Sequence, residues 1–148
     1  MSSSPNSNDS LSPGDMVSVV IEVARGSFVK RRPSGSVDFV SPFPCPYNYG
    51  SIVGTLGADA DPLDAIVLGP RLPYGLRVRV QVFGCVDFVD GGVPDPKWVC
   101  GSGALQPSDR AGVERFFHVY AGFKRVLYTL RRSSGGRTAC LGWVPPQS

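Results

Sequence analysis

Three carboxylates, Asp59, Asp61 and Asp64, lie within the six-residue segment DADPLD at 59–64. Pro62 has no backbone N–H, so the segment is predicted to be a loop rather than part of a regular strand ladder. Carboxylates this close repel one another and stay ionised readily only beside a cation. Their hard oxygen atoms suit Mg²⁺, Mn²⁺ or Ca²⁺. The alternative is a solvated turn, which is the usual fate of a single acidic segment rich in Gly or Pro.

A second polar group follows in the segment DGGVPDPK at 90–97, which contains Asp90, Asp95 and Lys97. Two acidic segments flanking a predicted strand pair weaken the interpretation as turns alone. Residues 59–95 hold six carboxylates, whereas residues 110–137 hold seven basic residues and one acid. An acidic centre with a basic flank suits a cation bound together with an anionic ligand. An EF-hand does not fit, because no Glu stands at the twelfth loop position.

The elements that must position these side chains are predicted to be short strands. The chain has 18 Gly and 14 Pro among 148 residues, which favours strands and turns over a helix bundle. Strands are predicted at 16–23, 36–40, 65–68, 76–89, 97–100 and 137–144. In 76–89 valine alternates with polar residues, which is typical of a half-buried strand, and Gly84 predicts a bulge. The segment 25–35 is predicted to be a polar, basic loop region, with a hairpin as the alternative, and 41–50 is predicted to be an ordered loop.

One segment, residues 108–132, has the period of an amphipathic helix. Its apolar residues recur at spacings of three and four: Val113, Phe116, Phe117, Tyr120, Phe123, Leu127 and Leu130. Ser108 is the predicted N-cap, and Gly122 is predicted to bend or end the helix. Short strands followed by one helix predict an α+β fold, an antiparallel β-barrel with a flanking C-terminal amphipathic helix.

Length and composition predict a single domain at residues 15–148, preceded by a disordered tail at 1–14 that is rich in Ser, Asn and Pro. Apolar runs fall short of the roughly 18 residues of a membrane helix, and no secretory signal is recognisable. A cytoplasmic location is therefore expected. Four cysteines form no CxxC pair and only one histidine is present, which argues against zinc and favours reduced thiols.

In order along the chain, these segments resemble the motifs of the soluble family I inorganic pyrophosphatases. The segment 59–64 is similar to the family signature D-G-D-P-L-D, with Ala60 where Gly is usual. The segment 90–97 fits the family's D-x-x-x-x-D-x-K. Further matches are 20–23 to a V-E-I-P strand, 26–30 to G-S-x-x-K, 48–50 to N-Y-G, 116–120 to F-F-x-x-Y and 142–143 to G-W. The resemblance covers roughly residues 17–143.

The resemblance implies a five-stranded OB-like barrel and the hydrolysis of pyrophosphate to two phosphates with three or four Mg²⁺ ions, Mn²⁺ being an alternative. The implied metal site consists of Glu22, Asp59, Asp64, Asp90 and Asp95. Asp61 is implied as general base for a water shared by two metals, which becomes hydroxide near neutral pH. The implied phosphate ligands are Lys30, Tyr49, Lys97 and Tyr120. Pyrophosphate and phosphate are the expected partners, no membrane is expected, and a homo-oligomer is left open.

Several family positions are occupied by other residue types. Arg32, Phe39, Cys45 and Ala121 replace a Glu, an Arg, a Tyr and a Lys. No counterpart of the family's last helix is expected in this sequence. Arg32, Lys124 or Arg125 are the candidates to substitute for the missing cations. Two alternatives therefore stay open. One is a similar fold with weak activity or another phosphoanhydride substrate; the other, less favoured because aromatic residues are sparse, is an OB-like nucleic-acid binder using residues 30–32.

Overall fold

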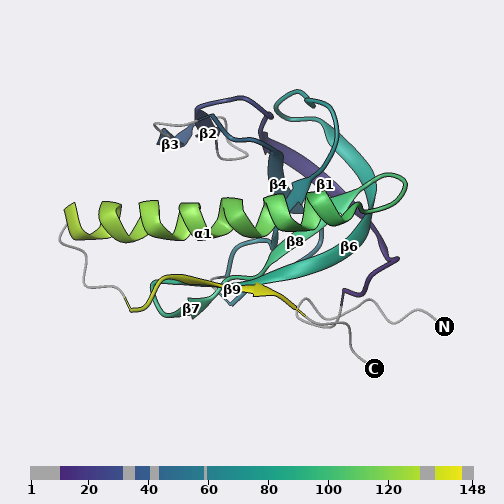
Figure 1. Cartoon of the computed structure of the whole chain (residues 1–148). Coiled ribbons are helices and arrows are strands. Elements are labelled where there is room, and N and C mark those ends of the chain that lie inside the picture. The colour runs from purple at the N-terminus through teal and green to yellow at the C-terminus, as the bar shows by residue number, and fades with distance from the viewer. Residues whose placement is uncertain (1–10, 32–35, 41–43, 59, 131–135, 145–148) are drawn as a thin grey trace.

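The computed structural model describes residues 11–31, 36–40, 44–58, 60–130 and 136–144. In chain order the elements are β1 (Met16–Val23), β2 (Val29–Arg31), β3 (Val37–Val40), β4 (Asn48–Ile52), β5 (Asp64–Val67), β6 (Arg77–Asp90), β7 (Val93–Pro94), β8 (Lys97–Gly101), α1 (Pro107–Leu130) and β9 (Ala139–Trp143). The helix α1 crosses the strands, with the β2–β3 hairpin on one side of it and β9 on the other (Figure 1). This mixture of a large sheet and a helix confirms the predicted α+β class.

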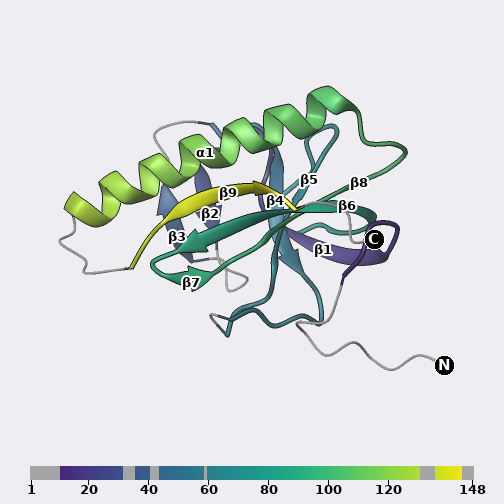
Figure 2. The same ribbon diagram turned by 60° about the horizontal axis from the view of Figure 1, so that its bottom comes forward.

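Five of the described strands form a closed circuit of hydrogen-bonded pairs. In the order β1, β4, β5, β8, β6, each strand pairs with the next, and β6 pairs again with β1. The β5–β8 pair is parallel, so the prediction of an antiparallel arrangement is wrong there. A ring with an odd number of strands cannot alternate direction throughout, so one pair of neighbours must be parallel. The long strand β6 extends beyond the ring, where β7 and β9 pair with it (Figure 2).

Strands with clear alternation lie where the sequence predicts them. β1 has the predicted bounds, and β6 matches the predicted 76–89 to within one residue at each end. Val80 and Val82 are buried on the inner face of β6. The pairing of β6 with β8 shifts register between Val82 and Gly84, which confirms the expected irregularity at this glycine. A Cβ at Gly84 would lie 2.5 Å from the ring of Trp143, so only glycine lets this ring pack across the strand.

The segment 41–50 contains a strand that the sequence analysis missed. β4 begins at Asn48, immediately after the proline-rich stretch, and its first three residues are buried. The loop prediction for 48–50 is therefore wrong, because the prolines restrict only the residues before the strand. β4 packs tightly against β1: a Cβ at Gly50 would lie 2.0 Å from the carbonyl oxygen of Val20. No side chain fits at this position.

The core has two parts, one on each face of the central strands. Successive residues of β5 alternate between them, so that Ala65 and Val67 join one cluster and Ile66 joins the other. The second cluster fills the space between the sheet and α1, where Val113 and Phe117 are fully buried. Because both faces of β5 are buried, its position is fixed to within one residue. The polar residue at the start of β5, Asp64, is therefore held in a fixed position as well.

The helix α1 begins one residue earlier than predicted. Pro107 occupies its first position, where the missing N–H costs nothing. The carboxylate of Asp109 accepts a hydrogen bond from the Gln106 N–H at 3.2 Å, so Gln106 and Asp109 form the cap and the assignment of Ser108 as N-cap is wrong. The helix also does not end at Gly122 but continues to Leu130, which is 76% exposed although it was predicted on the apolar face. Within the described ranges, no helix is long and apolar enough to span a membrane.

Part of the predicted N-terminal tail packs against the folded core. Residues 1–10 of the predicted tail lie outside the described residues, whereas Leu11 packs against the first core cluster and Gly14 N–H donates to Val82 O at 2.8 Å.

All four cysteines are described, and all are free thiols. Burial raises the pKa of Cys85 and of Cys100 to about 12, so both are protonated at neutral pH.

Candidate active site

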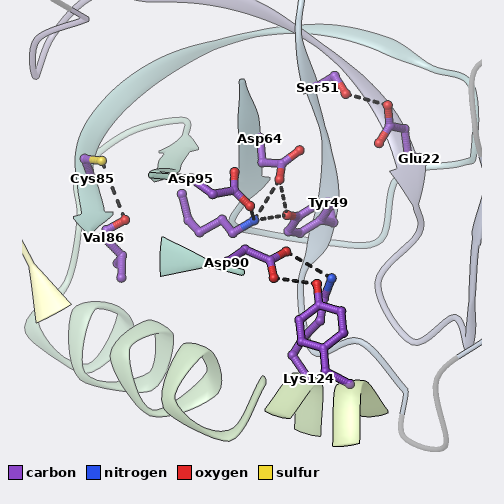
Figure 3. A network of polar contacts seen from close by, with 11 residues as sticks. Glu22, Tyr49, Ser51, Asp64, Cys85, Val86, Asp90, Asp95 and Lys124 are labelled. Carbon is purple, nitrogen blue, oxygen red and sulfur yellow. Dashed lines mark hydrogen bonds and ion pairs between the residues drawn. The ribbon is translucent and has the colours of Figure 1, made fainter. Parts of the chain in front are cut away.

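A row of polar side chains crosses four neighbouring strands. The register pairs Ser51 of β4 with Asp64 of β5, and Asp64 with Lys97 of β8. On the other side of the row, the Ser51 hydroxyl donates a hydrogen bond to the buried carboxylate of Glu22 on β1. Figure 3 shows the Glu22–Ser51 pair beside the group formed by Asp64, Asp95 and Tyr49. The strand register therefore gathers residues that are far apart in the sequence.

Lys97 is the centre of this row. Its Nζ donates to Asp64 Oδ2 and to Asp95 Oδ2, both at 2.7 Å, and to the phenol oxygen of Tyr49 at 3.0 Å. The phenol in turn donates to Asp64 Oδ2 at 2.8 Å. The side chain of Lys97 is only 3% exposed, while those of Asp64 and Asp95 are 17% and 15% exposed. Three residues that the resemblance implies as metal or phosphate ligands thus meet around the ammonium group of a fourth, Lys97.

Aromatic rings surround the same ammonium. The Nζ of Lys97 lies 5.1 Å from the ring centre of Phe88, 5.7 Å from that of Tyr49 and 5.9 Å from that of Tyr120. The rings of Phe88 and Tyr120 at these distances attract a cation, whereas Tyr49 meets the ammonium through its hydroxyl oxygen rather than its ring face. Burial alone would lower the pKa of Lys97, but the charges of Asp64 and Asp95 outweigh it and raise the pKa. Burial, followed by the charge of Asp64, raises the pKa of Tyr49 well above its usual value, so both groups are protonated at neutral pH.

Asp90 lies in a second cluster, with two residues of α1. Lys124 Nζ lies 3.1 Å from Asp90 Oδ2, and the Tyr128 hydroxyl donates to Asp90 Oδ1 at 2.6 Å. Burial would raise the pKa of Asp90, but the hydrogen bond from Tyr128 and the charge of Lys124 together lower it. The ring of Tyr120 lies 5.7 Å from Lys124 Nζ and 5.9 Å from Lys97 Nζ, so Tyr120 joins the two clusters.

Tyr128, Phe88 and Ser51 also take part in these clusters, although their roles were not predicted from the sequence. The signal for Tyr128 was present: positions 120, 124 and 128 are spaced by four and share one helix face. Lys124 was only one of three candidates to replace a missing cation, and the structure places it against Asp90. For Phe88 and Ser51 the sequence carried no distinguishing signal, because an aromatic or a serine in a strand usually serves packing or solvation.

The described part of the DADPLD segment, residues 60–64, forms a turn that leads into β5. The backbone N–H of Gly57 donates to the carbonyl of Asp61 at 2.7 Å, and Ala60 N–H donates to Gly57 O at 3.0 Å. Ala60 has φ = 66°, the left-handed conformation that explains why glycine is usual there. Leu63 anchors the turn in the core, and Asp61 is exposed at the surface. Asp59 lies outside the described residues.

Asn48, the first residue of the N-Y-G segment, fixes the loops on either side of the site. Its side-chain oxygen accepts hydrogen bonds from the backbone N–H groups of Arg25 at 3.0 Å and Leu72 at 2.8 Å. Its side-chain nitrogen donates to the carbonyls of Val67 at 3.2 Å and Pro70 at 2.9 Å. Every hydrogen-bonding position of this fully buried amide is therefore used. Asn48 holds β4, and with it Tyr49, in place.

The positions that depart from the family pattern have different surroundings. Lys30 and Phe39 are paired in register on β2 and β3, but their side chains and the whole of Arg32 lie outside the described part. Ala121 is 1% exposed in the core beneath α1, so its side chain does not face the polar clusters. Cys45 is half-buried, and its thiol donates to the carbonyl of Tyr47 at 3.0 Å.

The donor chemistry of the described residues fits a magnesium ion. Asp64 and Asp95 direct one oxygen each to a common point, where Lys97 Nζ now lies. Mg²⁺ is usually bound through one or two carboxylates together with water and substrate phosphates. Among the described residues no group of three His, Cys, Asp or Glu side chains is placed to hold a metal by itself. These two carboxylates therefore suit an ion that keeps several non-protein ligands.

Comparisons with known proteins agree with this geometry. Residues 19–108 match the family model described as inorganic pyrophosphatase. The chain is 40% identical over 96 residues to an inorganic pyrophosphatase of Gluconobacter oxydans, a match covering 60% of this chain and 55% of the relative. It is 30% identical over 133 residues to soluble inorganic pyrophosphatase 5 of Arabidopsis thaliana, covering 74% and 61%. The matched part thus spans little more than half of these curated relatives.

Solved structures extend the likeness to most of the fold. The structure superposes on an inorganic pyrophosphatase from Thermus thermophilus with a TM-score of 0.69 at 29% identity, covering 90% of this chain and 87% of that one. The enzyme from Neisseria gonorrhoeae gives a TM-score of 0.67 at 28% identity, with 90% and 86% covered. The family match covers more than half of the chain, and the polar clusters contain the residues of the family motifs. The chain belongs to the inorganic pyrophosphatase family.

Proposed function

We propose that this chain hydrolyses inorganic pyrophosphate to two phosphates with the help of a divalent metal ion. The observation that carries the proposal is the convergence of Asp64, Asp95 and Tyr49 on the buried ammonium of Lys97. This arrangement combines ionised carboxylates with a fixed cation and a phenol, in a chain that belongs to the pyrophosphatase family. It therefore has groups for a metal and groups for a phosphate at one place.

The metal site in this proposal comprises Glu22, Asp59, Asp64, Asp90 and Asp95, with Mg²⁺ as the physiological ion and Mn²⁺ as a substitute. A bound Mg²⁺ supplies positive charge to the phosphate oxygens and makes water more acidic. Lys97 holds one oxygen of Asp64 and one oxygen of Asp95 at a common point before any ligand arrives.

The remaining residues bind the anion and accept a proton. Lys30, Tyr49, Lys97 and Tyr120 are the proposed phosphate ligands. Lys124 adds a cation next to Tyr120, on the same helix face, where it replaces the charge that the buried Ala121 does not provide. Asp61, exposed on its turn, is the proposed general base that takes the proton of the attacking water.

Fold type, cellular location and assembly are also proposed from the family resemblance. The closed circuit of strand pairs supports an OB-like barrel. We expect a cytoplasmic protein, in line with its family. A homo-oligomer is supported by exposed apolar side chains near the end of α1, where Val126 is 57% and Leu130 76% exposed. Sedimentation velocity measures this assembly directly.

The test is phosphate release from pyrophosphate by the purified chain, with Mg²⁺ and with EDTA. Asp61→Asn should lower turnover by about 10²- to 10⁴-fold, the scale of a lost general base, while it keeps Mg²⁺ affinity. Asp64→Asn should weaken Mg²⁺ binding, because a ligand loses its charge. Absence of phosphate release above the Asp64→Asn level would refute the function. Equal loss of Mg²⁺ affinity in both variants would refute the role of Asp61 as base.

A further inference from the structure

An apolar groove lies beside the Lys97 cluster. It has a volume of about 430 Å³ and runs between α1 and the chain segments around β1 and the start of β4. Six of its lining residues are aromatic: Phe28, Tyr47, Tyr49, Phe116, Tyr120 and Phe123. Its volume is within the range of about 300–1,000 Å³ that is usual for small-molecule sites. Inorganic pyrophosphate has no apolar atoms and does not account for such a surface.

The groove and the polar site share two walls. Tyr49 donates to Asp64 and accepts from Lys97, and its ring also lines the groove. Tyr120 lies between the ammonium groups of Lys97 and Lys124, and it lines the groove as well. A molecule whose phosphates lie at the edge of the polar site, beside Tyr120 and the partly exposed Lys124, can therefore continue into the groove. The groove would then hold whatever organic group the phosphates carry.

The lining also indicates the kind of organic group. Phe116 and Tyr120 present nearly parallel rings, with 21° between their planes and 6.1 Å between their centres. The exposed side chain of Arg115 adds a planar cation to the same lining. Aromatic rings and a guanidinium favour a flat heterocycle over a flexible alkyl chain. A nucleoside diphosphate combines such a heterocycle with two anhydride-linked phosphoryl groups.

We propose that the groove binds the base of a nucleoside diphosphate whose phosphates occupy the pyrophosphate site. This inference rests on the proposed function, since it extends the substrate class of the same site. In the reaction, water attacks the terminal phosphorus, a new P–O bond forms and the bond to the bridging oxygen breaks. The products are a nucleoside monophosphate and phosphate, and the proton of the water passes to Asp61 and then to solvent.

The experiment first measures binding without turnover. Isothermal titration compares the α,β-methylene analogue of ADP with methylenediphosphonate, which has the same two phosphoryl groups and no base. Stacking of a base on aromatic side chains is worth about 1–3 kcal/mol, so the nucleotide analogue should bind about tenfold more tightly. Equal affinity would overturn the proposal. A diphosphate ester with an alkyl chain that binds as tightly as the nucleotide analogue would overturn the preference for a heterocycle.

Two variants test whether the preference for the nucleotide analogue arises in the groove. Val119 lines the groove and is 61% exposed, so Val119→Glu should leave the fold intact and remove the tenfold preference for the nucleotide analogue. Val126 is 57% exposed on the same helix but does not line the groove, so Val126→Glu should retain the preference. Loss in both variants, or in neither, would overturn the assignment. Tight self-association that Val119→Glu abolishes, with no nucleotide binding, would show instead that a second copy occupies the groove.

Turnover separates this proposal from the proposed function. Phosphate release is measured from pyrophosphate and from ADP with Mg²⁺ in the same preparation. Release from pyrophosphate but not from ADP, at concentrations where the analogue binds, would overturn the substrate class alone. Release from neither would overturn the proposed function, and the binding comparison would still decide whether the groove recognises a base.

Discussion

Replacing Lys97 with methionine should destabilise the fold strongly. The variant removes the ammonium that Asp64 and Asp95 share at 2.7 Å and leaves two like charges facing each other. Removing one partner of a buried ion pair costs about 3–5 kcal/mol. Because the two carboxylates are 17% and 15% exposed, water relieves part of the cost, and we expect about 3 kcal/mol. For a chain of this size this corresponds to a decrease in Tm of about 6–12 °C.

Thermal unfolding followed by circular dichroism in EDTA measures this loss, with two further ion pairs for calibration. Lys124→Met breaks a pair whose side chains are 19% and 20% exposed, and about 1–2 kcal/mol is expected. Arg110→Met breaks a helical pair at 3.6 Å with 48% and 33% exposure, for which the expected loss is at most about 0.5 kcal/mol. The three losses should therefore follow burial. A Tm of Lys97→Met equal to that of the unmodified chain would refute the reasoning.

Magnesium should restore part of the stability of Lys97→Met. In the unmodified chain Mg²⁺ must displace the ammonium from Asp64 and Asp95, whereas in the variant no ammonium competes. An ion present at 100 times its Kd stabilises a folded protein by about 2.7 kcal/mol. The rise in Tm on adding Mg²⁺ should be larger for the variant. An equal or smaller rise would show that Mg²⁺ does not bind at these two carboxylates.

Three other changes test the surroundings of the site. Ala60→Gly should raise the free energy of unfolding by about 0.5 kcal/mol in urea titrations, because relief of the left-handed φ of 66° exceeds the added chain entropy. Asn48→Ala should lower it by about 3 kcal/mol, since four hydrogen bonds to buried or half-buried backbone are lost; a loss under about 1 kcal/mol would contradict this. Tyr128→Phe should cost about 1 kcal/mol at pH 6. Tyr128 helps to lower the pKa of Asp90, so its contribution is complete above the unfolded pKa of about 3.9 and is lost as pH falls through the lower folded value. The difference between the two proteins in metal-free buffer should therefore shrink as the pH is lowered below that unfolded value.

Alternation of apolar residues was the reliable signal for this fold. β1 and β6 were predicted almost to the residue because one face of each is buried. β4 was missed because its central residues, Tyr49 and Gly50, are chosen for the phenol and for close approach to β1 rather than for strand propensity. The parallel pairing of β5 and β8 depends on how five strands close, which no local pattern records.

The candidate site was predictable to a similar degree. Asp64, Asp95, Lys97 and Tyr49 were all named from motifs, and the structure brings them together. That Lys97 is the centre of this group could not be predicted, because it depends on the register of two strands and on burial. The partners of Asp90 come from α1, whose rotation relative to the sheet is set by core packing. Local sequence does not encode that rotation.

The pairing of Asp64 with Lys97 also has a consequence for how the chain folds. β5 and β8 lie side by side and parallel, but the chain must first pass through β6 and β7 to return in the same direction. Contacts that close such a long loop form slowly, since the entropy of the intervening chain is lost before they contribute. The ion pair between Asp64 and Lys97 therefore forms only when this loop has closed and β5 lies beside β8. The candidate site is thus expected to appear late in folding, with the long-range pairing of these two strands.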